Sequence, residues 1–178
     1  SSAASDVYKR QSLLRCLSEF QIGMLFSQYK EYHHVFKSCN VGSKSIPWKW
    51  CCNCPKCLFV YIILSPFIPK EEMISIFGED MYENKELLNT FIELCGYSDK
   101  KPFECVGTYS EVRYSISLLV NRGGKLPYLL QYYKDNYPLE LDIDFKIQYN
   151  HEHNIPEEFE KIVRAELDRV NEVIDDDK

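Results

Sequence analysis

The sequence predicts a mostly helical α/β fold built around one hydrophobic core. Its 178 residues are 45% hydrophobic, which is enough for a single domain with a real interior. Apolar residues recur at helical spacing in most segments. Residues 139–149 instead alternate apolar and polar side chains, which is typical of a half-buried strand. We therefore expect many helices and little strand.

The first part of the chain predicts a tail, a helix, a short strand and a loop. Residues 1–11 (SSAASDVYKRQ) resemble translated adaptor sequence, and we expect a disordered tail there. Residues 12–29 carry apolar side chains at helical spacing, which predicts an amphipathic helix. Residues 32–38 are partly β-branched or aromatic and predict a strand. Residues 40–50 contain Gly, Ser and Pro and predict a loop.

Four helices are expected in the middle of the chain. Residues 55–64 are apolar on every side, and their β-branched side chains also suit a buried strand. Pro55 at a first helical turn and the Ser-Pro stop that follows favour a buried helix. Glycines mark the ends of other runs, as Gly78 and Gly96 do. The four predicted helices are residues 55–64, 70–77, 84–94 and 109–120.

The last part of the chain predicts a helix at 127–133, the strand at 139–149 and a long final helix. Asn154 as cap, Pro156 early and the acids that follow are typical of a helix start. The buried stripe of this helix is predicted to consist of Phe159, Ile162, Val163, Leu167, Val170 and Ile174.

Composition excludes some classes of protein. The net charge is −6 and no basic stripe runs along any segment, so nucleic acid is not an expected partner. The longest apolar run, residues 57–64, is too short to cross a membrane. Eight cysteines occur without a signal peptide, and their spacing favours metal, so we expect the cytoplasm. Because no initiator Met is present, we expect the C-terminal part of a longer protein.

Four cysteines predict a structural zinc site. Cys51, Cys54 and Cys57 form a C-x2-C-x2-C motif, and Cys39 approaches from upstream to complete a tetrahedron. Four thiolates close the coordination sphere and leave no position for substrate. Their sulfurs should lie within about 4 Å of each other. Cys52 is expected to point away, although the spacing leaves it open as a replacement for Cys51.

Two groups of residues resemble known families. The Cys39 segment and the cysteine motif resemble the metal loop of the PP-loop ATP-pyrophosphatases, notably 7-cyano-7-deazaguanine synthase. Residues 101–107 (KPFECVG), followed by Glu111 and Arg113, resemble the C-terminal region of the bacterial UDP-N-acetyl-alpha-D-muramoyl-L-alanyl-L-glutamate epimerases, the MurL family. Other stretches that fit this family in order are Leu17-Ser18-Glu19, Gly23, Ser38-Cys39-Asn40, Ile76-Phe77-Gly78 and Ile155-Pro156.

The resemblance implies an ATP- and Mg²⁺-dependent epimerase of peptidoglycan precursor synthesis. Such an enzyme converts the L-glutamate of a nucleotide-sugar dipeptide to D-glutamate. The resemblance also implies the C-terminal end of a doubly wound domain, with residues 12–66 completing a nucleotide-hydrolase-like unit and residues 67–178 forming a helical extension. No Ser-Gly-Gly-x-Asp-Ser phosphate loop occurs in the sequence. We therefore expect the ATP site in a missing N-terminal half, and an inactive fragment.

The same resemblance points to four candidate catalytic residues. Cys105 can act as an acid–base thiol if its pKa falls toward neutral, but free Cys is also a common core residue. Glu104 can act as a base, bind Mg²⁺, or simply be exposed. Arg113 suits a phosphate or carboxylate. Glu111 lies two positions away on the predicted helix, so the two side chains do not face each other.

Two alternatives compete with the epimerase. A deazaguanine-type synthase shares the metal loop, but it is expected to end soon after the zinc helix. Here a long segment, residues 58–178, follows the last ligand. A non-catalytic zinc-stapled module is the other alternative, and it predicts no pocket near the candidate catalytic residues.

Overall fold

The structure is a computed structural model, and it describes residues 12–44, 46, 49–100 and 106–176. The predicted tail at 1–11 lies outside the described residues. The fold is predominantly helical, and no strand occurs in the part of the chain that is described. No helix in that part is long and apolar enough to cross a membrane.

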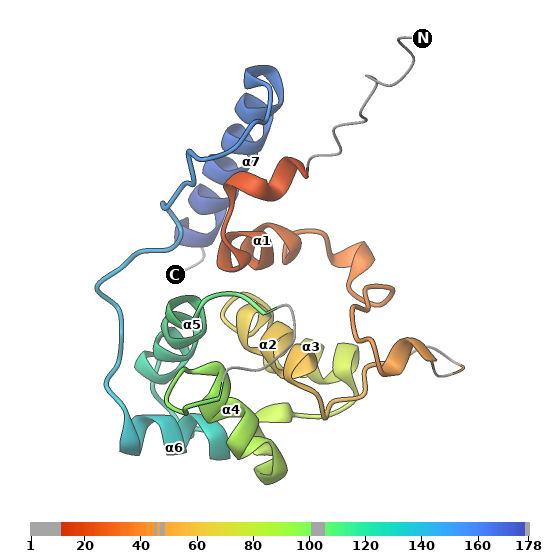
Figure 1. Ribbon diagram of the computed structural model, residues 1–178, viewed down its shortest axis with the longest axis vertical. Coiled ribbons are helices and arrows are strands. Elements are labelled where there is room, and N and C mark those ends of the chain that lie inside the picture. Colours follow the sequence, from red (N-terminus) through yellow and green to blue (C-terminus); the bar gives the residue numbers. More distant parts are fainter. Residues whose placement is uncertain (1–11, 45, 47–48, 101–105, 177–178) are drawn as a thin grey trace, which may run out of the picture.

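Helix α2 (Pro55–Leu64) forms the centre of the molecule, as Figure 1 shows. It packs against α1 (Glu19–Phe26), α4 (Leu88–Leu94) and α5 (Tyr109–Asn121). Seven of its ten residues are buried, which confirms the predicted buried helix. Because apolar side chains cover its whole circumference, this helix is stable only when surrounded by others.

The remaining helices enclose this centre. Helix α3 (Lys70–Phe77) ends at Gly78 as predicted. Helix α6 (Tyr128–Asn136) packs against α5 and against the short 3-10 helix η4 (Met81–Glu83). The predicted helix at 84–94 is divided into a 3-10 turn, η5 (Lys85–Leu87), and α4.

The first predicted helix is confirmed only over its second half. Residues 12–29 form a 3-10 turn, η1 (Leu13–Cys16), and then α1. Ser18 causes the break, because its side chain accepts a hydrogen bond from the Gln21 backbone N–H while the Gln21 side chain accepts one from the Ser18 N–H. This capping box starts a new helix inside an otherwise periodic pattern.

Both predicted strands are also wrong. Part of residues 32–38 forms a turn after the 3-10 helix η2 (Lys30–Tyr32), closed by a hydrogen bond from Phe36 N to Tyr32 O. Residues 139–149 wrap along the helices without a strand partner in the described part of the chain. Their backbone carbonyls accept hydrogen bonds from the Gln21 side chain instead. The alternation of apolar and polar residues was therefore not sufficient to form a β-sheet.

The final helix, α7 (Glu157–Asp176), lies beside η1 and α1 (Figure 1). Its predicted stripe is confirmed at Val163, Leu167 and Val170, which are buried in a cluster with Cys16 and Leu25. Phe159 and Ile162, however, are 42% and 65% exposed. The helix starts at Glu157, later than the sequence suggests.

Candidate functional site

Four cysteine sulfurs converge next to the first turn of α2. The Sγ atoms of Cys39, Cys51, Cys54 and Cys57 all lie within 4.8 Å of one another. Three of these separations are 4.0 Å (Cys39 to Cys54), 3.6 Å (Cys51 to Cys57) and 3.4 Å (Cys54 to Cys57). A zinc tetrahedron with bonds of about 2.3 Å requires separations of about 3.8 Å. The cluster is therefore close to the size that a tetrahedral metal ion needs, but it is slightly wider than the predicted spacing of about 4 Å.

The backbone is shaped to fit these sulfurs. The Gly42 N–H donates to Cys39 Sγ at 3.1 Å, and the Cys57 N–H donates to Cys54 Sγ at 3.4 Å. A Cβ at Gly42 would lie 1.6 Å from the Lys49 carbonyl oxygen, so only glycine fits there. The hydrogen bond with Cys57 lowers the pKa of the Cys54 thiol to about 5. The four residues can hold a metal ion.

Cys52 is separated from the cluster by its backbone conformation. Its φ of 52° turns the side chain away, and its thiol donates to the Phe77 carbonyl at 3.1 Å. Burial raises the pKa of this thiol to about 12. The alternative in which Cys52 replaces Cys51 therefore has no support in the geometry.

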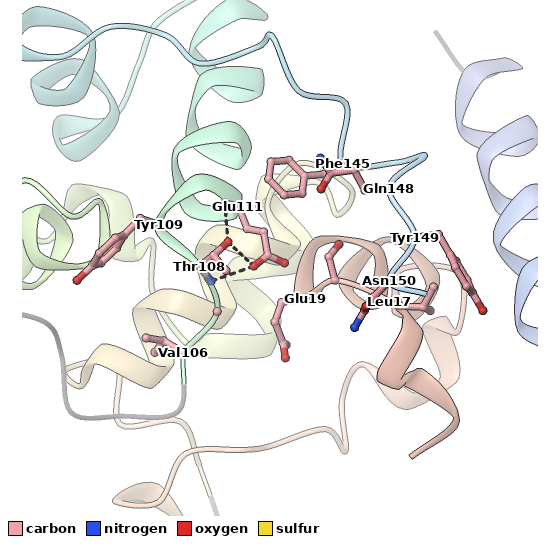
Figure 2. A pocket seen from close by; sticks show the side chains of 12 residues that line it. Leu17, Glu19, Val106, Thr108, Tyr109, Glu111, Phe145, Gln148, Tyr149 and Asn150 are labelled. Carbon is pink, nitrogen blue, oxygen red and sulfur yellow. Dashed lines mark hydrogen bonds between the residues drawn. The ribbon is translucent and has the colours of Figure 1, made fainter. Parts of the chain in front are cut away.

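Glu111 lies in a second place, where α1 and α5 both begin. It is the third residue of α5, and its Oε2 accepts hydrogen bonds from the Thr108 backbone N–H at 2.9 Å and the Thr108 hydroxyl at 2.6 Å (Figure 2). Its Oε1 accepts a further bond from the Phe20 N–H of α1 at 3.2 Å. Because Glu111 is only 4% exposed, this carboxylate joins the two helix starts.

An open pocket of about 800 Å³ lies beside this junction (Figure 2). Side chains and backbone from the start of α1, the start of α5 and the segment before α7 line it together. Its lining consists of Leu17, Ser18, Glu19, Val106, Gly107, Thr108, Tyr109, Glu111, Phe145, Gln148, Tyr149 and Asn150.

Glu19 is the second carboxylate of this pocket. The residue as a whole is exposed, but partial burial of its carboxyl raises its pKa. The nearby charge of Glu111 raises this pKa further, while Lys56 on α2 lowers it. Gly107 lies between the two glutamate side chains. A larger residue would be crowded there, because a Cβ would lie 3.0 Å from Glu111 Oε2 and 3.1 Å from Glu19 Cγ.

Arg113 is directed elsewhere. Its guanidinium forms an ion pair with Glu140 at 3.1 Å and lies over the Tyr97 ring at 5.3 Å. It does not belong to the lining of the Glu111 pocket as described. Glu104 and Cys105 lie outside the described residues. The catalytic roles suggested for these two residues therefore stay predictions.

Sequence reasoning overlooked Glu19 as a site residue. The chain offered a signal, because Ser18-x-x-Gln21 and Thr108-x-x-Glu111 are both capping boxes. Each box fixes the start of a helix, but neither reveals that the two starts meet. That fact depends on how α1 and α5 pack on α2.

Comparison with known proteins shows which family the chain resembles. Residues 35–130 match the model of the MurL C-terminal domain. The chain is 42% identical over 113 residues to the UDP-N-acetyl-alpha-D-muramoyl-L-alanyl-L-glutamate epimerase of a Micromonospora species, covering 62% of this chain and 25% of that protein. It is 37% identical over 116 residues to the epimerase of the same name from Xanthomonas oryzae pv. oryzae, covering 62% and 26%.

The epimerase of the same name from Salinispora tropica is 41% identical over 115 residues, covering 64% of this chain and 25% of that protein. The chain thus spans about a quarter of the length of the curated relatives it matches. No solved structure matches it.

Proposed function

Because this chain belongs to the family of the MurL C-terminal domain, we propose that it is the C-terminal part of an ATP-dependent epimerase. Its substrate is the L-glutamate of UDP-N-acetylmuramoyl-L-alanyl-L-glutamate, which it converts to D-glutamate in the cytoplasm during peptidoglycan precursor synthesis. The observation that carries this proposal is the 37–42% identity to three proteins that bear the name of this epimerase.

The chemistry explains why such an enzyme consumes ATP. A free carboxylate makes its own α-proton very weakly acidic. Adenylation of the α-carboxylate removes that charge and makes the neighbouring C–H easier to deprotonate. A base then takes the proton from one face, an acid returns a proton to the other, and hydrolysis releases the product and AMP.

This chemistry assigns different functions to different parts of the whole protein. Residues 12–66 complete a doubly wound PP-loop-type domain that lies mainly upstream, and residues 67–178 form its helical extension. ATP and Mg²⁺ bind in the upstream part. The described residues of the present chain form helices, so the parallel sheet of such a domain belongs to that part as well.

The metal has a structural task in this proposal. Zn²⁺ bound by Cys39, Cys51, Cys54 and Cys57 holds the Cys39 loop against the start of α2. The geometry of the four sulfurs supports this assignment. A closed four-thiolate site has no open position for substrate, so the proton transfers take place elsewhere.

Proton transfer is assigned to the motif that precedes α5. Cys105 is the thiol acid–base group, and Glu104 assists it or binds the nucleotide's Mg²⁺. Glu111 fixes the pocket. Support comes from chain order, because Val106 and Gly107 follow Cys105 directly and line the pocket with Glu111.

The test uses the full-length protein that contains this chain. UDP-N-acetylmuramoyl-L-alanyl-L-glutamate is incubated with ATP and Mg²⁺, the peptide is hydrolysed, and the glutamate is separated on a chiral column. We expect D-glutamate and AMP to appear together and only when ATP is present. Glutamate that stays entirely in the L form would overturn the proposal. The 178-residue chain alone serves as the control and should be inactive.

A further inference from the structure

The two carboxylates of the α1–α5 pocket have different surroundings. Three donors occupy Glu111: the Thr108 N–H, the Thr108 hydroxyl and the Phe20 N–H. The side chain is buried and works as a hydrogen-bond acceptor that joins two helices. Its hydrogen bonds are therefore used to hold the two helix starts together, which suits a positioning role.

Glu19 has the opposite environment. It is the first residue of α1, it is exposed, and it lines the same pocket as Glu111. Within the part of the chain that the structure describes, its carboxylate forms no hydrogen bond and no ion pair. The charged groups that act on it are Glu111 from α5 and Lys56 from α2. A pair of carboxylates in unlike environments is the pattern that acid–base catalysis uses.

The close approach of Gly107 restricts the position of the Glu19 side chain. A Cβ at Gly107 would lie 2.9 Å from Phe59 Cζ on α2, 3.0 Å from Glu111 Oε2 and 3.1 Å from Glu19 Cγ. Glycine at this position lets the segment before α5 approach α1 closely. The distance between the two helix starts is thereby fixed by packing, and a catalytic group needs such a fixed position.

We propose that Glu19 is a catalytic acid–base carboxylate and that its pocket receives the α-carbon of an activated acidic amino-acid residue. This rests on the proposed epimerase function. On one face, the α C–H bond breaks, the proton moves to a Glu19 carboxylate oxygen, and the electron pair stays in the enolate of the acyl adenylate. The second acid–base group of the epimerase gives a proton to the opposite face. In the reverse direction Glu19 returns its proton to carbon.

Glu111 is a positioning residue in this arrangement. Its negative charge disfavours the charged form of Glu19 and so makes that carboxylate a stronger base. Its hydrogen bonds hold the starts of α1 and α5 together. Both effects act through Glu19 and not on the substrate.

The test compares Glu19→Gln with Glu71→Gln in the full-length protein. Glu71 is an exposed glutamate in the first turn of α3, so it matches Glu19 in type and helix position but lies outside the pocket lining. We expect Glu19→Gln to lower the rate of D-glutamate formation by about 100-fold or more, as loss of a general base does. Substrate-dependent exchange of pyrophosphate into ATP, which reports adenylation, should stay within a few-fold of wild type. Glu71→Gln should match wild type in both assays.

The pH dependence of the activity provides a second test of the role of Glu19. A base must be deprotonated, so activity falls as the pH drops through the pKa of Glu19. Glu111→Gln removes a charge that raises this pKa, so the acid limb of kcat/KM should move to lower pH. A loss of folding alone would lower the whole profile without moving the limb.

The outcomes separate the two proposals. If wild type makes no D-glutamate, the epimerase function itself is wrong. If wild type is active and Glu19→Gln keeps full activity, Glu19 is not catalytic although the function stands. If Glu19→Gln loses pyrophosphate exchange and epimerisation equally, the pocket serves binding or adenylation, and the assignment of Glu19 to proton transfer is overturned.

Discussion

At the scale of single residues, surroundings decide what a side chain can do. Cys52 and Cys54 are two positions apart, yet burial raises the pKa of one thiol to about 12 while a hydrogen bond with Cys57 lowers that of the other to about 5. Cys52 donates to a backbone carbonyl, whereas Cys54 faces three other sulfurs. The spacing of the motif predicted these separate positions, because successive C-x2-C sulfurs turn round one centre.

Substitution of each of these two cysteines by serine gives a matched pair of variants. Cys54→Ser should lower the zinc affinity of the chain by at least about 100-fold, because a hydroxyl replaces a thiolate ligand. Cys52→Ser should keep one zinc per chain, because its sulfur lies outside the cluster. Metal content after dialysis against a competing chelator measures both. Equal zinc loss in the two variants would contradict the ligand assignment.

At the scale of elements, capping residues and close contacts decide where helices lie. The helix over residues 70–77 and the buried helix over 55–64 were predictable, because Gly78 and Pro55 mark their ends. The helix over residues 12–29 was not, because the capping box at Ser18 interrupts a continuous apolar pattern. The strand wrongly predicted at 139–149 and the overlong helix have the same cause. A periodic pattern shows which side of a segment is apolar, but it does not show which other segment packs there.

The crossing of α1 and α2 depends on Gly23. A Cβ at this position would lie 2.8 Å from Ile63 Cγ2 and 3.3 Å from the Ile63 carbonyl oxygen. Gly23→Val should therefore destabilise the chain by about 1–3 kcal/mol through overpacking, measured by urea unfolding.

Ile63→Ala supplies the control for this contact. In the double variant the extra valine methyls occupy space that the isoleucine has left, so the combined loss should be smaller than the sum of the two single losses. Strict additivity would mean that the two side chains do not compete for the same space.

At the scale of the whole molecule, the site could be predicted only in part. The four cysteines that could hold a metal ion follow from local spacing, so their cluster was predictable from the sequence. Glu111 was identified by family resemblance, and the structure adds that it joins α1 and α5. Glu19 was missed, because 91 residues separate Phe20 from the Glu111 side chain that bonds it. Contacts of this range depend on the packing of both helices on α2, which no local pattern records.

We propose that the enzyme to which this chain belongs inverts glutamate by breaking its α C–H bond. The most direct test supplies the full-length protein with ATP, Mg²⁺ and substrate whose glutamate carries deuterium at the α-carbon. The account predicts that the D-glutamyl product has exchanged this deuterium for a solvent proton and that it forms more slowly than from unlabelled substrate. D-glutamyl product that retains all of its deuterium and forms at an unchanged rate would contradict the account.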